Sequence, residues 1–394
     1  MGNRKRRKRP QGDTIKVIVI VLLAMVAMTV ILIWIGNFEL PERTQTDVEY
    51  TMPRSSLPSS NGESDTDNTG QDTVSAEHVF YWEHGGHLEL PIKGATGWAA
   101  TNIVLRAEAN TSSNNVMNLT PGYAFTILDE SGSWWYVRLP NGTAGWVESN
   151  RCFINFPDIL PSIVYNITNA SSSVFRSSGF DLPGITGLQL YSAQSYNPRL
   201  GRDEFIVPGM YSLARSLFNV QQTALSNNET IIVYEIYRPR ITQRAVAAAL
   251  NQLLAENEVA RRAISDSSWS VGNFISQGLS NHQRGAAIDA SIGNVNETEI
   301  AQSGDYSYVS VSRYTLIHAH SAMHELSPLS VRTGGNSSEA APGIGNMQRY
   351  FTSAGFRPLS SEWWHFDHNA SLSNAVSIGE FFTETIYSEP PFIN

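Results

Sequence analysis

The sequence has one cysteine and few charged side chains. Because Cys152 stands alone among 394 residues, no disulfide can form within the chain, and we expect Cys152 to be a small buried hydrophobe. Charged residues make up 16% of the chain and leave a net charge of −9, a balance that excludes general binding to nucleic acid. Hydrophobic residues make up 41%, which is enough for the cores of two or three domains of roughly 100 to 200 residues each.

Positive charge is concentrated just before the longest apolar run. The basic residues RKRRKR occupy positions 4–9, and residues 17–35, VIVIVLLAMVAMTVILIWI, carry no charge. A helix of that length spans roughly 28 Å, close to the hydrocarbon core of a bilayer, and a cleaved signal peptide would have a shorter apolar region. We therefore expect a cytoplasmic tail over 1–16 and a single transmembrane helix over 17–35, with the rest of the chain outside the cell. An extracellular protein without disulfides is typical of bacteria.

The stretch after this apolar run is rich in Ser, Thr, Asp, Asn and Pro, as in MPRSSLPSSNGESDTDNTGQDT at residues 52–73. Such a segment buries too little apolar surface to offset the entropy that is lost on ordering. We expect a flexible linker over residues 36–93 that holds the following domains away from the membrane.

Short apolar runs separated by turn residues distinguish residues 94–153. Four or five short strands in about sixty residues predict a small, closed, all-β barrel. The runs lie at residues 103–109, 123–130, 134–139 and 144–149. The stretch resembles bacterial SH3-like domains, which commonly bind cell-wall peptides, although a small spacer barrel with core tryptophans stays open as an alternative. The residues that carry this resemblance are Leu105, Arg106, Trp135, Val137, Gly142, Gly145, Trp146 and Val147.

Helical and strand-like patterns alternate over residues 178–394, which follow a connector at 154–177. The spacing of apolar residues predicts helices over 207–228 and 241–264. Apolar, strand-like runs predict strands at 230–237, 285–292 and 361–368. We expect one α+β domain of about 210 residues here.

The segment SNHQRGAAID, residues 280–289, places His282 and Asp289 seven positions apart. With a single cysteine in the chain, a zinc site would have to use histidine and carboxylate ligands. Gly285 allows a tight backbone turn, and Ala287 lies on the same face of a strand as Asp289 without crowding an ion. Spacing alone is weak grounds for a metal site, because it provides no third ligand.

A second candidate segment is SEWWHFDHN, residues 361–369. Glu362 and His365 are three positions apart, so on a regular strand they would face opposite sides. A bulge or a strand end could still bring Glu362 to the water on an ion that His365 binds. The alternative is an aromatic-rich buried strand with incidental histidines.

Together the two segments, S-x-H-x-x-G-x-A-x-D and E-x-W-H, resemble the VanY-type zinc D-alanyl-D-alanine carboxypeptidases over about the last 210 residues. The sequences LYSAQSYNPRLG, YRPRITQ and AMHELS add to the resemblance. It implies that one zinc ion is bound by His282, Asp289 and His365. It also implies that Glu362 is the general base and that Arg238 binds the terminal carboxylate of the substrate. The residue types suit these roles, because a carboxylate can move a proton and a guanidinium can bind a carboxylate through two hydrogen bonds.

The same resemblance implies a fold and a substrate. The fold would be that of the D-Ala-D-Ala carboxypeptidases and the Hedgehog-like proteins, and the substrate a peptidoglycan stem peptide that loses its terminal D-amino acid. Ser280 and Gln243 are candidates for hydrogen bonds to this substrate. L,D-carboxypeptidase action on tetrapeptides and a non-catalytic, zinc-containing cell-wall binding module stay open as alternatives. A dipeptidase is disfavoured, because its short substrate would not call for a tethered wall-binding domain.

One further motif, HELSP at residues 324–328, begins like the zinc motif HExxH. Pro328 stands where the second histidine of that motif belongs, so the motif is incomplete. A similar segment lies near the site in the family that this chain resembles, so the resemblance implies that His324 and Glu325 support the site or the fold. His368 could serve as a zinc ligand only if the E-x-W-H motif were shifted by three residues.

Overall fold

The structure is a computed structural model that describes residues 49–51, 78–166, 175–182, 194–266, 268–276, 278–332 and 342–378. All of these residues belong to one compact unit that begins at Val48. No helix within the described ranges is long and apolar enough to cross a membrane. The predicted cytoplasmic tail and transmembrane helix lie outside these ranges, as does most of the predicted linker.

The last part of the predicted linker, residues 78–93, is packed against the rest of the described chain. It contains the short helix η1 (Tyr81–His84), and Leu88 and Leu90 are buried. The buried Glu89 carboxylate accepts a hydrogen bond from the Ser162 backbone amide at 2.8 Å. Ordered structure therefore begins before the predicted start of the barrel.

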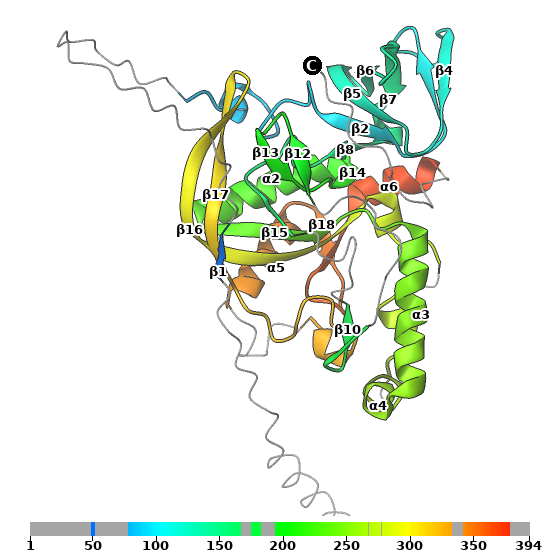
Figure 1. The fold of residues 1–394 in the computed structure, drawn as a ribbon, viewed down its shortest axis with the longest axis vertical. Coiled ribbons are helices and arrows are strands. Elements are labelled where there is room, and N and C mark those ends of the chain that lie inside the picture. The colour runs from blue at the N-terminus through cyan, green and yellow to red at the C-terminus, as the bar shows by residue number, and fades with distance from the viewer. Residues whose placement is uncertain are drawn as a thin grey trace, which may run out of the picture. The chain divides into compact units, whose positions relative to one another are not determined.

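An eight-stranded sheet contains the strands of the predicted barrel (Figure 1). Its members are β2 (Thr96–Ala99), β3 (Ile103–Arg106), β4 (Asn115–Leu119), β5 (Ala124–Ser131), β6 (Trp134–Arg138), β7 (Ala144–Glu148), β8 (Cys152–Asn155) and β14 (Pro208–Met210). They are ordered β14-β8-β2-β5-β6-β7-β3-β4. Trp135 and Val137 on β6 are fully buried while their neighbours are partly exposed, as alternation on a strand requires. Cys152 is buried, as predicted.

A seven-stranded sheet lies in the C-terminal part of the chain. Its members are β1 (Glu49–Thr51), β9 (Val164–Tyr165), β15 (Glu229–Glu235), β16 (Ala287–Ser303), β17 (Tyr306–Leu316), β18 (Phe356–Pro358) and β19 (His365–His368). β15 is buried along its whole length, in agreement with its unbroken apolar run. β16 is longer than predicted, because its exposed second half continues as a ribbon with β17, drawn in yellow in Figure 1.

The α-helices that the structure describes are α2 (Tyr211–Ser226), α3 (Arg240–Glu256), α4 (Glu258–Ser265), α5 (Pro342–Ser353) and α6 (Asn369–Ile378). The prediction of one helix over 241–264 was wrong, because Asn257 interrupts it. The backbone of Asn257 is extended, with φ −116° and ψ 113°, and its side chain accepts a hydrogen bond from the Ala260 amide at 3.1 Å. Asn257 therefore ends α3 and caps α4. The helix predicted over 207–228 begins later, because residues 208–210 form β14.

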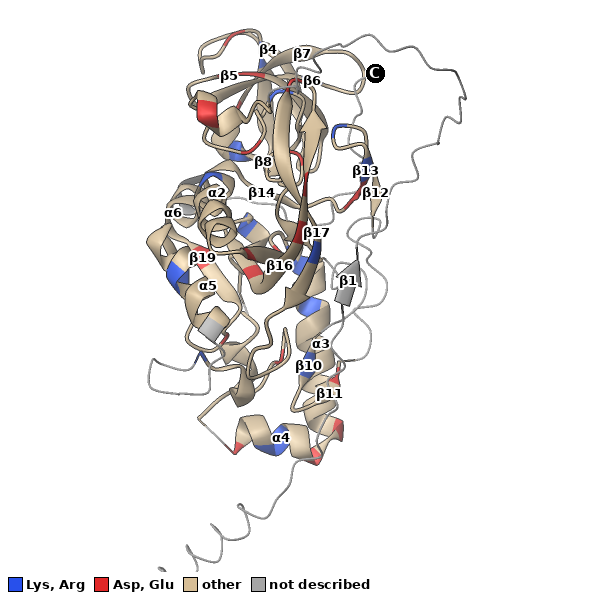
Figure 2. Ribbon diagram, turned by 90° about the vertical axis from the view of Figure 1, so that its left-hand side faces the viewer, with Lys and Arg blue, Asp and Glu red and all other residues tan. Residues whose placement is uncertain are grey.

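Short helices and strands connect these parts. They are η2 (Ser149–Arg151), β10 (Arg176–Ser177), β11 (Phe180–Asp181), β12 (Ser195–Asn197), β13 (Arg202–Glu204), η4 (Val271–Asn273), η5 (His282–Arg284) and η6 (Pro328–Ser330). Figure 2 shows most of the described ribbon in tan, with acidic and basic positions scattered along it and both signs present on α4. The arrangement combines an all-β part with a mixed α and β part, as the sequence predicts.

Candidate metal centre and active site

The two candidate segments meet where β16 pairs with β19. The strands are antiparallel, and Asp289 lies directly opposite His365 in the register. His282 lies in η5, immediately before β16, and Gly285 ends η5 with a φ of 58°. This left-handed conformation favours glycine, and it turns the chain from η5 into β16. The turn and the strand pairing therefore bring His282, Asp289 and His365 together.

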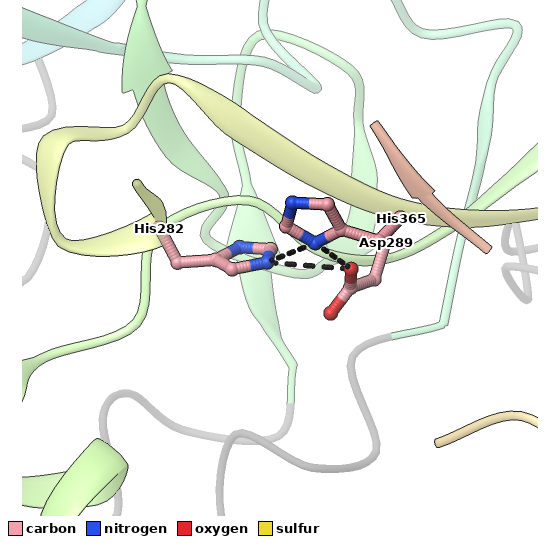
Figure 3. Close-up of side chains that lie close together, drawn as sticks. All are labelled: His282, Asp289 and His365. Carbon is pink, nitrogen blue, oxygen red and sulfur yellow. Dashed lines mark hydrogen bonds and ion pairs between the residues drawn. The ribbon is translucent and has the colours of Figure 1, made fainter. Parts of the chain in front are cut away.

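Three donor atoms from these residues face one another (Figure 3). His282 Nε2 lies 3.1 Å from His365 Nδ1 and 3.3 Å from Asp289 Oδ1, and His365 Nδ1 lies 3.0 Å from Asp289 Oδ1. A tetrahedral zinc ion with bonds of about 2.1 Å holds its ligands about 3.4 Å apart. The three atoms are therefore spaced as a zinc ion requires, to within a few tenths of an ångström.

The other nitrogen of each histidine has a hydrogen-bond partner that fixes the ring. His282 Nδ1 lies 2.9 Å from the Ile236 carbonyl oxygen, which can only accept. His365 Nε2 lies 3.2 Å from Asp367 Oδ1. Each outer nitrogen therefore carries the proton, which leaves the lone pairs of His282 Nε2 and His365 Nδ1 for a metal.

Asp367, which binds the outer nitrogen of His365, was not named from the sequence, although its spacing from His365 could have indicated it. It lies two positions after His365 on β19, so both side chains share one face of the strand. Asn281 and Arg357 donate hydrogen bonds to its carboxylate at 2.8 and 2.9 Å. Burial would raise the pKa of Asp367, but the hydrogen bond and charge of His365 hold it well below its usual range. Asp367 is therefore ionised and orients His365.

The carboxylate of Asp289 is almost fully buried and uses both oxygens. Oδ1 faces His282 and His365, while Oδ2 accepts hydrogen bonds from His324 Nε2 at 3.0 Å and Arg238 Nη2 at 3.1 Å. Burial opposes ionisation, but the charge and hydrogen bonds of the histidines hold the pKa of Asp289 well below its usual range. Asp289 is therefore a fixed negative charge beside the two histidine nitrogens that face the cluster.

His324, from the incomplete HExxH motif, supports the site from behind. Its ring stacks on Phe175 with 4.6 Å between centroids, and its backbone φ of 56° is unusual for a residue other than glycine. The position agrees with the expectation that His324 supports the site. It binds Asp289 from the loop before η6, a contact that no spacing in the sequence indicates.

Arg238 and Gln243 lie beside the metal-ligand cluster. Arg238 follows β15 and is buried, with hydrogen bonds from Nε to Glu235 at 2.8 Å and from Nη1 to the Gln243 side-chain oxygen at 2.8 Å. Its guanidinium carbon lies 5.1 Å from the centre of the Phe175 ring. Burial lowers the pKa of Arg238, but the carboxylates of Glu235 and Asp289 raise it above its usual range, so the group is a permanent cation.

A second trio of possible ligands, Glu235, Asp289 and His324, also lies within 4.8 Å. The Arg238 guanidinium contacts both carboxylates of this trio. A cation already occupies the space between them, so a metal ion there would be repelled. The cluster of His282, Asp289 and His365 is the better metal site.

Glu362 lies next to the donor cluster, with Oε2 3.8 Å from His365 Nδ1. β19 begins only at His365, so Glu362 lies outside the strand and strand alternation does not turn it away. Burial raises the pKa of the Glu362 carboxyl to about 8; the charge of His365 lowers it and that of Asp289 raises it. The carboxyl is thus adjacent to the cluster and exchanges its proton near neutral pH.

A cavity of about 430 Å³ opens over the cluster. The predicted site residues in its wall are Arg238, Gln243, Ser280, His282, Glu362 and His365. Asp289 lies behind the wall in contact with the two histidines. The structure therefore brings together all seven residues named from the sequence.

His368 is not part of this cluster. Its Nδ1 lies 2.7 Å from Ser371 Oγ and its Nε2 lies 2.9 Å from Ser216 Oγ. Burial lowers the pKa of His368 to about 4, so the ring is neutral at physiological pH. Its contacts agree with the expectation that it does not replace His365.

The comparison with known families agrees with this geometry. Residues 209–382 match the D-ala-D-ala dipeptidase family. Residues 101–151 match the bacterial SH3 domain family. No curated protein matches the chain.

The match to the D-ala-D-ala dipeptidase family supports a metallopeptidase, because peptidases of this family depend on zinc. The donor set fits that metal in number, type and spacing. Burial lowers the pKa of His365, but the hydrogen bonds of Asp289 and Asp367 and the charges of Asp289 and Glu362 raise it to about 10. Metal binding at this cluster therefore competes with a proton and weakens as the pH falls.

We expect the purified protein to bind about one zinc ion per chain. Asp367→Asn should weaken zinc binding roughly 10- to 100-fold, because an outer partner is lost while the donors remain. His282→Ala and His365→Ala should weaken it further. Elemental analysis and competition with a chelator measure both effects, with the exposed His320→Ala as the control. Full zinc retention in both ligand variants would show that the assignment is wrong.

Proposed function

We propose that the protein is a zinc D,D-carboxypeptidase that hydrolyses the terminal D-Ala-D-Ala bond of peptidoglycan stem peptides. The observation that carries the proposal is one cavity wall with a metal-ligand cluster, a carboxyl of raised pKa and a guanidinium. His282, Asp289 and His365 would hold the zinc ion. Bound there, the ion would polarise the scissile carbonyl and acidify a water molecule.

Glu362 acts as the general base in this proposal. Its carboxylate takes a proton from the attacking water and passes it to the nitrogen of the departing D-alanine, so the peptide C–N bond breaks as the new C–O bond forms. Two features of Glu362, its burial and its position, favour this transfer of the proton. The burial that raises the pKa of Glu362 to about 8 makes the carboxylate a stronger base, and its place beside His365 brings it to the reacting water.

Arg238 binds the free carboxylate of the substrate. Its guanidinium lies in the cavity wall and is bonded directly to the ligand cluster, since Nη2 donates a hydrogen bond to Asp289 at 3.1 Å. Glu235 and Gln243 hold the guanidinium in place. We assign Gln243 to holding Arg238, and Ser280 to supporting η5, where its hydroxyl lies 3.3 Å from the His282 amide.

A D-Ala-D-Ala dipeptidase is the second candidate, because the family that residues 209–382 match is described by that activity. The bacterial SH3 match favours a polymeric substrate over a free dipeptide, since we propose that this domain binds the cell wall. L,D-carboxypeptidase action would use the same residues on a different bond.

Defined peptides separate these activities. The full chain in detergent should remove one D-alanine from a stem pentapeptide and leave the tetrapeptide intact, with products identified by mass spectrometry. Cleavage of the tetrapeptide would instead indicate L,D specificity. Cleavage of free D-Ala-D-Ala alone would identify a dipeptidase, and no cleavage of any of the three would leave a non-catalytic binding module.

Glu362→Gln tests the catalytic step. The amide has nearly the same shape but cannot take up the proton, so kcat should fall by about 10² to 10⁴ while zinc content and folding are kept. Glu325→Gln is the matched control, because Glu325 is equally buried but accepts hydrogen bonds from the Ser178 and Gly179 amides instead. Near-normal turnover of Glu362→Gln on the pentapeptide would rule out Glu362 as the base.

We also propose that residues 17–35 anchor the protein in the cell membrane, with the N-terminus in the cytoplasm and the peptidase outside. The basic run before an uncharged apolar stretch supports this orientation. The full chain should sediment with membranes and require detergent for extraction, whereas a chain lacking residues 1–35 should not. Protease added to intact spheroplasts should degrade the peptidase region. Protection of that region would reverse the proposed orientation.

A further inference from the structure

Strand β8 lies between the two parts of the chain that match known families. It covers Cys152–Asn155, after the SH3 match ends at residue 151 and before the peptidase match begins at residue 209. On one edge it pairs with β2, which pairs in turn with β5 inside the SH3 match, and on the other it pairs with β14 at the start of the peptidase match. β8 therefore connects the two matched parts within one sheet.

Phe153, in the middle of β8, fills the space between this sheet and the catalytic segments. Its side chain is fully buried, and its ring centre lies 5.3 Å from that of Tyr237. The same ring touches Gly285 so closely that a Cβ added there would lie 2.7 Å from Phe153 Cε1. Gly285 is also held by β14, since the Met210 amide donates to its carbonyl oxygen at 3.0 Å.

Gly285 and Tyr237 are both joined to the proposed machinery by hydrogen bonds or along the chain. Gly285 closes η5, where its amide donates to the His282 carbonyl oxygen at 3.0 Å. Tyr237 precedes Arg238, whose amide donates to the same His282 oxygen at 3.3 Å. One aromatic ring thus supports the segment with a metal ligand and the segment with the substrate-binding arginine.

We propose that Phe153 is a positioning residue for the catalytic site, so that β8 supports the peptidase from the sheet that it shares with the SH3 match. The proposal rests on the proposed function for its catalytic readout. The ring is wedged against Gly285 and Tyr237, which fixes the spacing between His282 and Arg238. A displacement of about 1 Å in such a site can cost as much as 10²-fold in rate.

The SH3 domain contains a matched control for this contact. Phe125 on β5 is also fully buried and lies against a glycine, with a Cβ on Gly97 placed 2.5 Å from Phe125 Cε2. This second contact lies between β5 and β2, within the SH3 sheet. Phe125→Leu and Phe153→Leu therefore remove the same atoms from similar surroundings, but only Phe153→Leu removes a contact with Gly285 and Tyr237.

We expect Phe153→Leu to weaken zinc binding about 10- to 100-fold, as loss of an outer partner does, and to lower kcat by a similar factor. Phe125→Leu should change neither by more than about twofold at a temperature where both variants are folded. Amide hydrogen exchange should be faster at residues 282–285 in Phe153→Leu alone. Equal effects of the two variants on zinc affinity and exchange would overturn the proposal. If Phe153→Leu does not fold, Phe153→Met takes its place, because methionine fills the space more fully.

A double variant tests the contact itself. Gly285→Ala should reduce zinc affinity, because alanine is strained at the φ of 58° and its methyl group also meets the Phe153 ring; Phe153→Leu should relieve the second of these costs and so restore part of the affinity in that background. Strictly additive losses would mean that the ring does not position the turn. Zinc affinity and hydrogen exchange need no substrate, so they decide this proposal even if the D-Ala-D-Ala peptides are not cleaved.

Discussion

The burial of one carboxylate, Asp289, is the constraint on which the site depends. A buried charge is costly unless it is paired and hydrogen-bonded, and Asp289 is almost fully buried. Two histidines face one oxygen, while His324 and Arg238 donate to the other. The partners that keep Asp289 ionised are thus the two histidines of the candidate metal site, the His324 that supports the cluster and the cation of the cavity, Arg238.

Further hydrogen-bond partners connect the histidines and Arg238 to the rest of the fold. The Ile236 carbonyl and Asp367 fix the histidine rings, and Glu235 and Gln243 fix Arg238. Ile236 and Arg238 both lie at the end of β15, so one strand end serves the metal ligands and the arginine. The site is therefore held by hydrogen bonds from β15, β16 and β19 together, and it is supported from below by β8 through Phe153. Through β8, the sheet that contains the SH3 match thus contacts the turn that follows His282.

Much of the local structure could be predicted from apolar patterns. Alternation on β6 and the unbroken run of β15 gave the correct element type, because each pattern reports how many faces of a strand are buried. The residues at which helices begin and end were harder to predict from the sequence. Asn257 divides a stretch with continuous helical spacing, and residues 208–210 leave a helical pattern to pair with β8. Both outcomes depend on hydrogen-bond partners that the local pattern does not contain.

For the candidate site, the sequence by itself determined the residue types and their motifs. His282, Asp289, Glu362 and His365 were named from two short segments and a family resemblance, because ligand chemistry limits the choice when one cysteine is present. Only the tertiary structure decided which atoms face one another. The register of β16 against β19 sets Asp289 opposite His365, and the late start of β19 frees Glu362 from strand alternation. The contacts of His324 and Phe153 were also decided there, because each joins separate strands or loops and leaves no spacing in the sequence, whereas Asp367 lies only two positions after His365 on β19.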